Sequence, residues 1–173
     1  MKIEERCRNV ELILSDVDGV LTDGAVIFDN QGIELKQFHI RDGLGIRLWQ
    51  KAGFKFGLLT ARSSHIVKMR AAELNIEILR QGFEDKLPAA KEVTASLRLK
   101  PEQVCYIGDD LTDLPVLRYV GLGVAVADAA KEVRAAADYV TRSAGGRGAV
   151  RELIELVLQA KNRWEDLIRN YVS

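Results

Sequence analysis

The stretch that decides the fold lies at residues 11–23 and reads ELILSDVDGVLTD. Its first five residues have the apolar character of a buried strand, and the acids Asp16 and Asp18 follow directly. Similar short apolar runs recur at residues 55–59, 104–107 and 123–126. Because helical patterns separate these runs, the sequence predicts an α/β fold: one Rossmann-like domain with a central parallel sheet flanked by helices.

The helical patterns are clearest toward the C-terminus. Apolar residues keep helical spacing at Val150, Leu153, Ile154, Val157 and Leu158, and more weakly at Leu87, Ala90, Thr94 and Leu97. We expect Trp164, Leu167 and Ile168 to extend the C-terminal face.

One segment breaks the alternation of strands and helices. Residues 25–28 and 33–38 are both β-like, and Asp-Asn-Gln-Gly at 29–32 has the composition of a turn. We therefore expect a β-hairpin inserted at about residues 24–38. No other segment is long enough for a separate cap, so residues 1–173 are expected to form a single domain without a large cap domain.

The overall composition limits the classes of partner. Lys plus Arg number 25, as do Asp plus Glu, so a nucleic-acid or anionic-membrane partner is not expected. There is no apolar run long enough for a membrane span, and none of the length of a signal peptide near the N-terminus. The two cysteines, Cys7 and Cys105, lack CxxC spacing, which favours a reduced cytoplasmic protein.

Two carboxylates follow the first predicted strand, at the edge where open α/β sheets bind ligands. One of them, Asp16 or Asp18, could attack phosphorus while the other acts as general acid and base. A turn rich in Asp and Gly is the structural alternative. The preceding apolar strand favours the catalytic interpretation.

Two further sites carry polar groups that suit a phosphoryl ligand. The Thr60 hydroxyl could bind a phosphoryl oxygen, or it could cap the following helix. Arg62 could be an anion ligand or a solvated charge. Lys86 could neutralise phosphate, although most lysines are surface residues.

A second acidic cluster follows the strand predicted at residues 104–107. Asp109, Asp110 and Asp113 lie within five residues of each other, directly after a glycine. Oxygen ligands of this kind suit a hard cation, with Mg²⁺ as the first choice. Some of these acids could instead stabilise the first turn of a helix.

The order of these sites resembles the motif sequence of the haloacid dehalogenase superfamily of phosphatases. The similarity is greatest to its small, capless branch, typified by 3-deoxy-D-manno-octulosonate 8-phosphate phosphatases. The matching stretches are residues 16–23, 38–46, 106–113, 120–129, 137–141 and 145–152. The Gly-Gly-Arg-Gly run at 145–148 is much more specific to this branch than the Asp-x-Asp-Gly motif.

The resemblance implies a role for each matching residue. Asp16 would be the nucleophile and a Mg²⁺ ligand, Asp18 the general acid and base whose backbone carbonyl also binds Mg²⁺, and Asp109 the third protein ligand. Thr60 and Lys86 would hold the phosphoryl group. The remaining residues of the set are Arg62, Asp42, Gly43 and Arg147 for substrate binding, with Asp110 and Asp113 in support.

The expected function is hydrolysis of a sugar-acid phosphate through an aspartyl-phosphate intermediate. The expected substrate is 3-deoxy-D-manno-octulosonate 8-phosphate. A nonulosonate 9-phosphate is the alternative substrate, since His39, Ala61 and Ser63 depart from the pattern of the branch. A non-catalytic oligomerisation module is the alternative of another class, which the complete acidic set disfavours. The resemblance also implies a homo-oligomer, a tetramer, built by packing of the hairpins. Arg147 is expected to bind the sugar's carboxylate.

Overall fold

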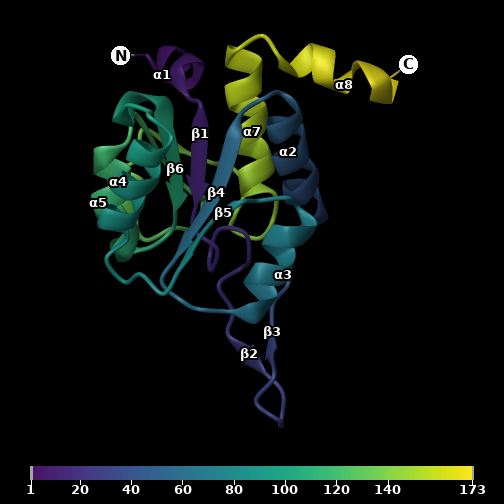
Figure 1. Ribbon diagram of the computed structural model, residues 1–173, viewed down its shortest axis with the longest axis vertical. Coiled ribbons are helices and arrows are strands. Elements are labelled where there is room, and N and C mark those ends of the chain that lie inside the picture. Colours follow the sequence, from purple (N-terminus) through teal and green to yellow (C-terminus); the bar gives the residue numbers. More distant parts are fainter. Residues whose placement is uncertain (1, 173) are drawn as a thin grey trace.

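The computed structural model describes residues 2–172 and is centred on a six-stranded parallel sheet. The strand order is β5-β4-β1-β6-β7-β8 (Figure 1). The strands are β1 (Leu12–Ser15), β4 (Lys55–Thr60), β5 (Ile78–Gln81), β6 (Val104–Gly108), β7 (Leu122–Ala125) and β8 (Tyr139–Val140). The predicted α/β fold with a parallel sheet is confirmed, and β1 lies in its interior, paired with both β4 and β6.

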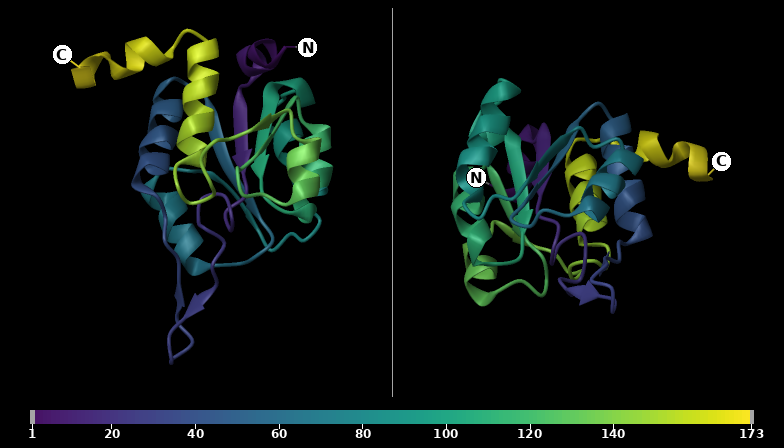
Figure 2. Two further views of the ribbon diagram at one scale, coloured as in Figure 1. Left: turned by 180° about the vertical axis from the view of Figure 1, so that it is seen from behind. Right: turned by 60° about the horizontal axis from the view of Figure 1, so that its bottom comes forward.

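Helices cover both faces of the sheet. The helices are α1 (Ile3–Asn9), α2 (Ile40–Lys51), α3 (His65–Glu73), α4 (Lys86–Ser96), α5 (Leu114–Tyr119), α6 (Lys131–Ala136), α7 (Ala149–Ala160) and α8 (Trp164–Val172). Two short 3₁₀ turns lie at Pro101–Gln103 and Leu111–Asp113. Helices α2, α3 and α7 lie on one side of the sheet, and α4, α5 and α6 on the other (Figures 1 and 2). Both faces of β1 are covered, and all four of its residues are buried.

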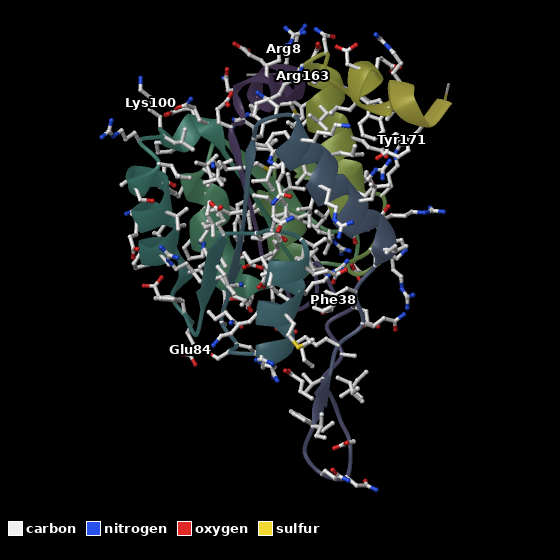
Figure 3. The ribbon with its side chains drawn as sticks, turned by 45° about the vertical axis from the view of Figure 1, so that its right-hand side comes forward. Arg8, Phe38, Glu84, Lys100, Arg163 and Tyr171 are labelled. Carbon is white, nitrogen blue, oxygen red and sulfur yellow. The ribbon has the colours of Figure 1, made fainter. Side chains whose placement is uncertain are left out.

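The predicted hairpin is present and projects away from the sheet (Figures 1 and 3). Its strands, β2 (Ile27–Phe28) and β3 (Glu34–Leu35), pair antiparallel. The Asp29 carboxylate closes the turn by accepting hydrogen bonds from the amides of Gln31 and Ile33, at 2.9 and 2.8 Å. The hairpin therefore has a well-defined turn, although its large apolar side chains are exposed.

The C-terminal segment differs from the continuous helical face that the sequence predicts. Helix α7 ends at Ala160, and Asn162 adopts a left-handed conformation with φ of 55°. This conformation ends a helix, so α8 begins at Trp164 and runs in a new direction (Figure 2). Within residues 2–172, none of the helices is long and apolar enough to cross a bilayer.

Candidate active site

Three neighbouring strands bring their polar ends to one edge of the sheet. Asp16 follows β1, Thr60 ends β4, and Asp109 follows β6. Since β4, β1 and β6 are adjacent and parallel, these side chains gather at one place. They line a pocket of about 270 Å³, whose other polar walls include Asp18, Arg62, Lys86 and Asp110. The structure thus brings together seven of the residues that the sequence singled out.

Lys86 is a buried lysine at the start of α4, held by two carboxylates. Its Nζ lies 2.6 Å from Asp16 Oδ2 and 2.6 Å from Asp113 Oδ1. Burial acts to lower the pKa of Lys86, but the charges of Asp16 and Asp113 outweigh it and raise the pKa. Lys86 is therefore an ammonium ion fixed beside the Asp16 carboxylate, where it can neutralise an anionic ligand.

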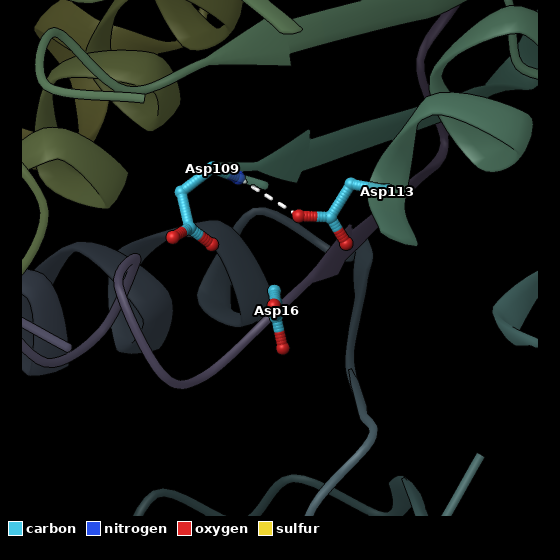
Figure 4. A group of neighbouring side chains, drawn as sticks. All are labelled: Asp16, Asp109 and Asp113. Carbon is cyan, nitrogen blue, oxygen red and sulfur yellow. Dashed lines mark hydrogen bonds between the residues drawn. The ribbon is translucent and has the colours of Figure 1, made fainter. Parts of the chain in front are cut away.

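Asp113 organises the loop after β6. Besides Lys86, its Oδ1 accepts a hydrogen bond of 2.6 Å from the hydroxyl of Tyr106. Its Oδ2 accepts the backbone amide of Asp109 at 2.8 Å (Figure 4) and that of Asp110 at 3.1 Å. With four donors around it, Asp113 orients Lys86 and the loop.

The carboxylates of Asp16, Asp109 and Asp113 form a close group that could hold a metal ion. One oxygen from each lies within 4.8 Å of the others (Figure 4). Burial and the charge of Asp113 raise the pKa of Asp16 to about 7, despite the nearby Lys86. Burial and the charges of Asp16 and Asp113 raise the pKa of Asp109 to about 8.

The donor set and one orphaned atom fit Mg²⁺. Asp109 Oδ1 is buried and has no hydrogen-bond partner among residues 2–172. Its carboxylate comes close to Gly19, where a Cβ would lie 2.1 Å from Asp109 Oδ2 and where φ is +89°. Only glycine allows this approach. Mg²⁺ prefers carboxylate and other oxygen ligands, and a bound ion would satisfy the unpaired Asp109 Oδ1.

The base of the hairpin contributes two residues to the site that no sequence motif indicates. Lys36 forms an ion pair with Asp18, and its Nζ lies 3.2 Å from Glu34 Oε1. Glu34 also pairs with Arg62 at 3.0 Å and accepts a hydrogen bond of 2.6 Å from Ser64 Oγ. Glu34 and Lys36 alternate with Ile33 and Leu35, which predicts that they share a face but not that the face meets the pocket.

Three predicted substrate-binding residues lie outside this pocket. Asp42 is buried in α2, and its Oδ1 accepts the backbone amide of Arg151 at 2.8 Å, in the first turn of α7. This contact gives Asp42 a capping role. Gly43 packs against the side chains of Arg70 and Leu74. Arg147, 60% exposed, lines a separate pocket of about 680 Å³. Substrate binding by these three residues stays a prediction.

Comparison with known proteins shows to which family the chain belongs. A model for haloacid dehalogenase-like hydrolases matches residues 63–154. The 3-deoxy-D-manno-octulosonate 8-phosphate phosphatase KdsC of Yersinia pestis is 48% identical over 161 residues, which cover 93% of this chain and 86% of that protein. The chain belongs to the haloacid dehalogenase-like hydrolase family. Membership confirms the predicted class of enzyme, a phosphoric monoester hydrolase.

Solved structures of the same family agree with the fold. The Yersinia pestis phosphatase has a TM-score of 0.93, and the match covers 94% of this chain and 88% of that one. A 3-deoxy-D-manno-octulosonate 8-phosphate phosphatase from Moraxella catarrhalis, 40% identical, has a TM-score of 0.96 with 98% and 97% covered. That enzyme was crystallised in complex with magnesium ion, phosphate ion and KDO. The family resemblance predicted from the sequence is therefore confirmed.

Proposed function

We propose that this hydrolase is a Mg²⁺-dependent phosphatase of 3-deoxy-D-manno-octulosonate 8-phosphate, acting in lipopolysaccharide sugar synthesis. The observation that carries the proposal is the buried contact between Asp16 and Lys86, beside the carboxylate of Asp109. The names of the relatives support the choice of sugar. The two cysteines are buried free thiols, which agrees with a cytoplasmic location.

The reaction proceeds in two phosphoryl transfers, first from the substrate to Asp16 and then from Asp16 to water. Asp16 attacks phosphorus while Asp18 donates a proton to the departing sugar oxygen, leaving the free sugar acid and an aspartyl phosphate. Asp18 then removes a proton from water, whose oxygen attacks phosphorus and releases Asp16.

Several groups that line the pocket stabilise the negative charge of the transferred phosphoryl group. The hydroxyl of Thr60 and the ammonium of Lys86 bind its oxygens and hold it in line with Asp16. When bound by Asp16, Asp109 and the backbone carbonyl of Asp18, Mg²⁺ offsets the repulsion between the nucleophile and the anionic substrate. Arg62 lines the same pocket, with its guanidinium paired to Glu34.

The test is a comparison of kcat/KM for two sugar-acid phosphates and a generic aryl phosphate. We expect 3-deoxy-D-manno-octulosonate 8-phosphate to exceed a nonulosonate 9-phosphate by at least ~10-fold, because a pocket shaped for one sugar loses contacts with the other. A higher kcat/KM for the nonulosonate 9-phosphate would contradict the proposed substrate and identify the nonulosonate 9-phosphate instead. Arg147→Ala should raise KM for the sugar acid and not for the aryl phosphate if Arg147 binds the carboxylate.

We propose in addition that the enzyme is a homotetramer assembled through the hairpin. The hairpin exposes five large apolar side chains in a short segment: Val26, Ile27, Phe28, Ile33 and Leu35. Phe28 alone is 56% exposed. A two-stranded hairpin is marginal in water and needs a partner surface. Hairpins of four copies can bury these side chains against one another.

Charges on the apolar hairpin should disrupt this assembly. We expect wild-type protein to sediment as a tetramer at assay concentrations and the double variant Phe28→Asp, Ile33→Asp to sediment as smaller species, because a charge buried at an interface is costly. Gln31→Glu, which adds a charge at the exposed turn, is the matched control and should leave the tetramer intact. A monomeric wild type, or a double variant that stays tetrameric, would disprove hairpin assembly.

A further inference from the structure

Lys36 is an unusual residue for a hairpin that otherwise projects into solvent. It lies just after β3, yet its side chain is only 1% exposed. Lysine is almost never buried to this extent unless its charge is paired. The pairing groups here are the carboxylates of Asp18 and Glu34, so Lys36 links the hairpin to the catalytic loop after β1.

The two oxygens of Asp18 have different surroundings. Oδ1 is paired with Lys36, whereas Oδ2 is buried and has no hydrogen-bond partner among residues 2–172. Asp18 also lines the pocket that holds Asp16 and Thr60. One oxygen is thus fixed by a cation, and the other is available for proton transfer.

Glu34 is the second carboxylate that contacts Lys36. Its carboxylate contacts Lys36, Ser64 Oγ and Arg62, which anchors β3 to the loop after β4. The Ser64 hydroxyl, together with Lys36 and Arg62, lowers the pKa of Glu34, so this carboxylate is ionised and can hold the ammonium in place. The position of Lys36 therefore depends on how the hairpin is seated on the body.

We propose that Lys36 is a positioning residue for the general acid and base, with its ammonium holding Asp18 Oδ1 so that Oδ2 serves both proton transfers. The inference rests on the proposed function and deepens it. A carboxylate without this contact samples several side-chain rotamers, and only some of them direct an oxygen at the reacting group. Because Lys36 belongs to the hairpin, packing of the hairpin also sets the position of the catalytic acid.

Substrates with different leaving groups separate positioning of Asp18 from a merely structural role. A sugar alcohol is a poor leaving group and needs the proton of Asp18, whereas p-nitrophenolate leaves without it. For Lys36→Met we expect kcat on the sugar phosphate to fall ~10²-fold, with KM changed less than about 3-fold. The first-turnover release of p-nitrophenol should fall less than about 5-fold.

Two controls and one alternative variant complete the experiment. Lys36→Arg keeps the charge and should recover most of the lost kcat, and Gln37→Met, at the exposed neighbouring position, should behave as wild type. Lys36→Gln replaces Lys36→Met if the latter does not fold. The ratio of the two substrates is measured within each preparation, so it is independent of the fraction of folded enzyme.

The outcomes are distinct for this inference and for the proposed function. Equal losses on both substrates, or no loss on either, would overturn the positioning role of Lys36. A wild type that hydrolyses other phosphates but not the sugar-acid phosphate would contradict the proposed substrate alone. The leaving-group comparison then uses the alkyl phosphate that the enzyme hydrolyses best.

Discussion

Asp16→Asn should lower kcat by at least about 10⁴-fold on any phosphate ester, the loss typical when a covalent nucleophile is removed. An amide is a far poorer nucleophile than a carboxylate, and it is a poorer ligand for Mg²⁺. Removal of Mg²⁺ with EDTA should also stop the wild-type reaction, and added Mg²⁺ should restore it. Steady-state assays with the sugar-acid phosphate and an aryl phosphate measure both effects.

The variant should nevertheless remain folded. Asp16 is buried between Lys86 and two further carboxylates, so a neutral amide relieves repulsion while Asp113 still pairs with Lys86. We expect a Tm at pH 8 equal to or above that of the Mg²⁺-free wild type. Asp166→Asn, at an exposed acid of α8 away from the pocket, is the matched control and should keep its activity. Full turnover by Asp16→Asn would rule out Asp16 as the nucleophile.

Mg²⁺ should stabilise the protein much more at pH 8.5 than at pH 6, and Asp109→Ala should remove most of this gain. The raised pKa values of Asp16, about 7, and Asp109, about 8, mean that the folded Mg²⁺-free protein resists ionisation of both groups. Unfolded carboxylates ionise near pH 4. Their stabilising contribution in the neutral form is therefore lost as pH rises from about 4 to 8.

A bound cation reverses that loss because it favours the ionised carboxylates. At about 100 times its Kd, Mg²⁺ contributes about 2.7 kcal/mol. In a chain of this size that is a rise in Tm of roughly 5–10 °C. Differential scanning fluorimetry across a Mg²⁺ titration at each pH measures it.

Asp109→Ala should also lower activity by about 10²-fold or more, with partial recovery at high Mg²⁺. Asp110→Ala is the comparison variant, because Asp110 is exposed and lies outside the carboxylate cluster. The Asp110→Ala variant should keep most of the stabilisation that Mg²⁺ gives the wild type. A Mg²⁺ titration of Asp109→Ala that matches the wild type would show that Asp109 is not a ligand.

The sequence predicts the centre of this fold better than its edges. Strands β1, β4 and β6 are buried on both faces, so each is a continuous apolar run that is visible in the sequence. The edge strand β5 is half-buried throughout and includes Arg80 and Gln81, so it carries no such signal. Strand β8 has only two residues, which is too short for any periodicity.

The same contrast applies to the site. Asp16, Thr60 and Asp109 could be predicted because adjacency of parallel strands alone brings them together. Lys36 and Glu34 could not, because their contacts depend on how the hairpin folds back against the loops. The contact of Asp42 could not be predicted either: its carboxylate accepts the backbone amide of Arg151 in α7, a contact between elements far apart in the sequence.

The most direct test of the account is detection of a phosphoryl group on Asp16 in the variant Asp18→Asn. With p-nitrophenyl phosphate the first transfer needs no proton from Asp18, whereas hydrolysis of the aspartyl phosphate needs it as a base. The phosphoenzyme should therefore accumulate, and mass spectrometry after acid quench should find one phosphoryl group per chain, on Asp16. Release of p-nitrophenol with Asp16 unmodified at every quench time would contradict the account.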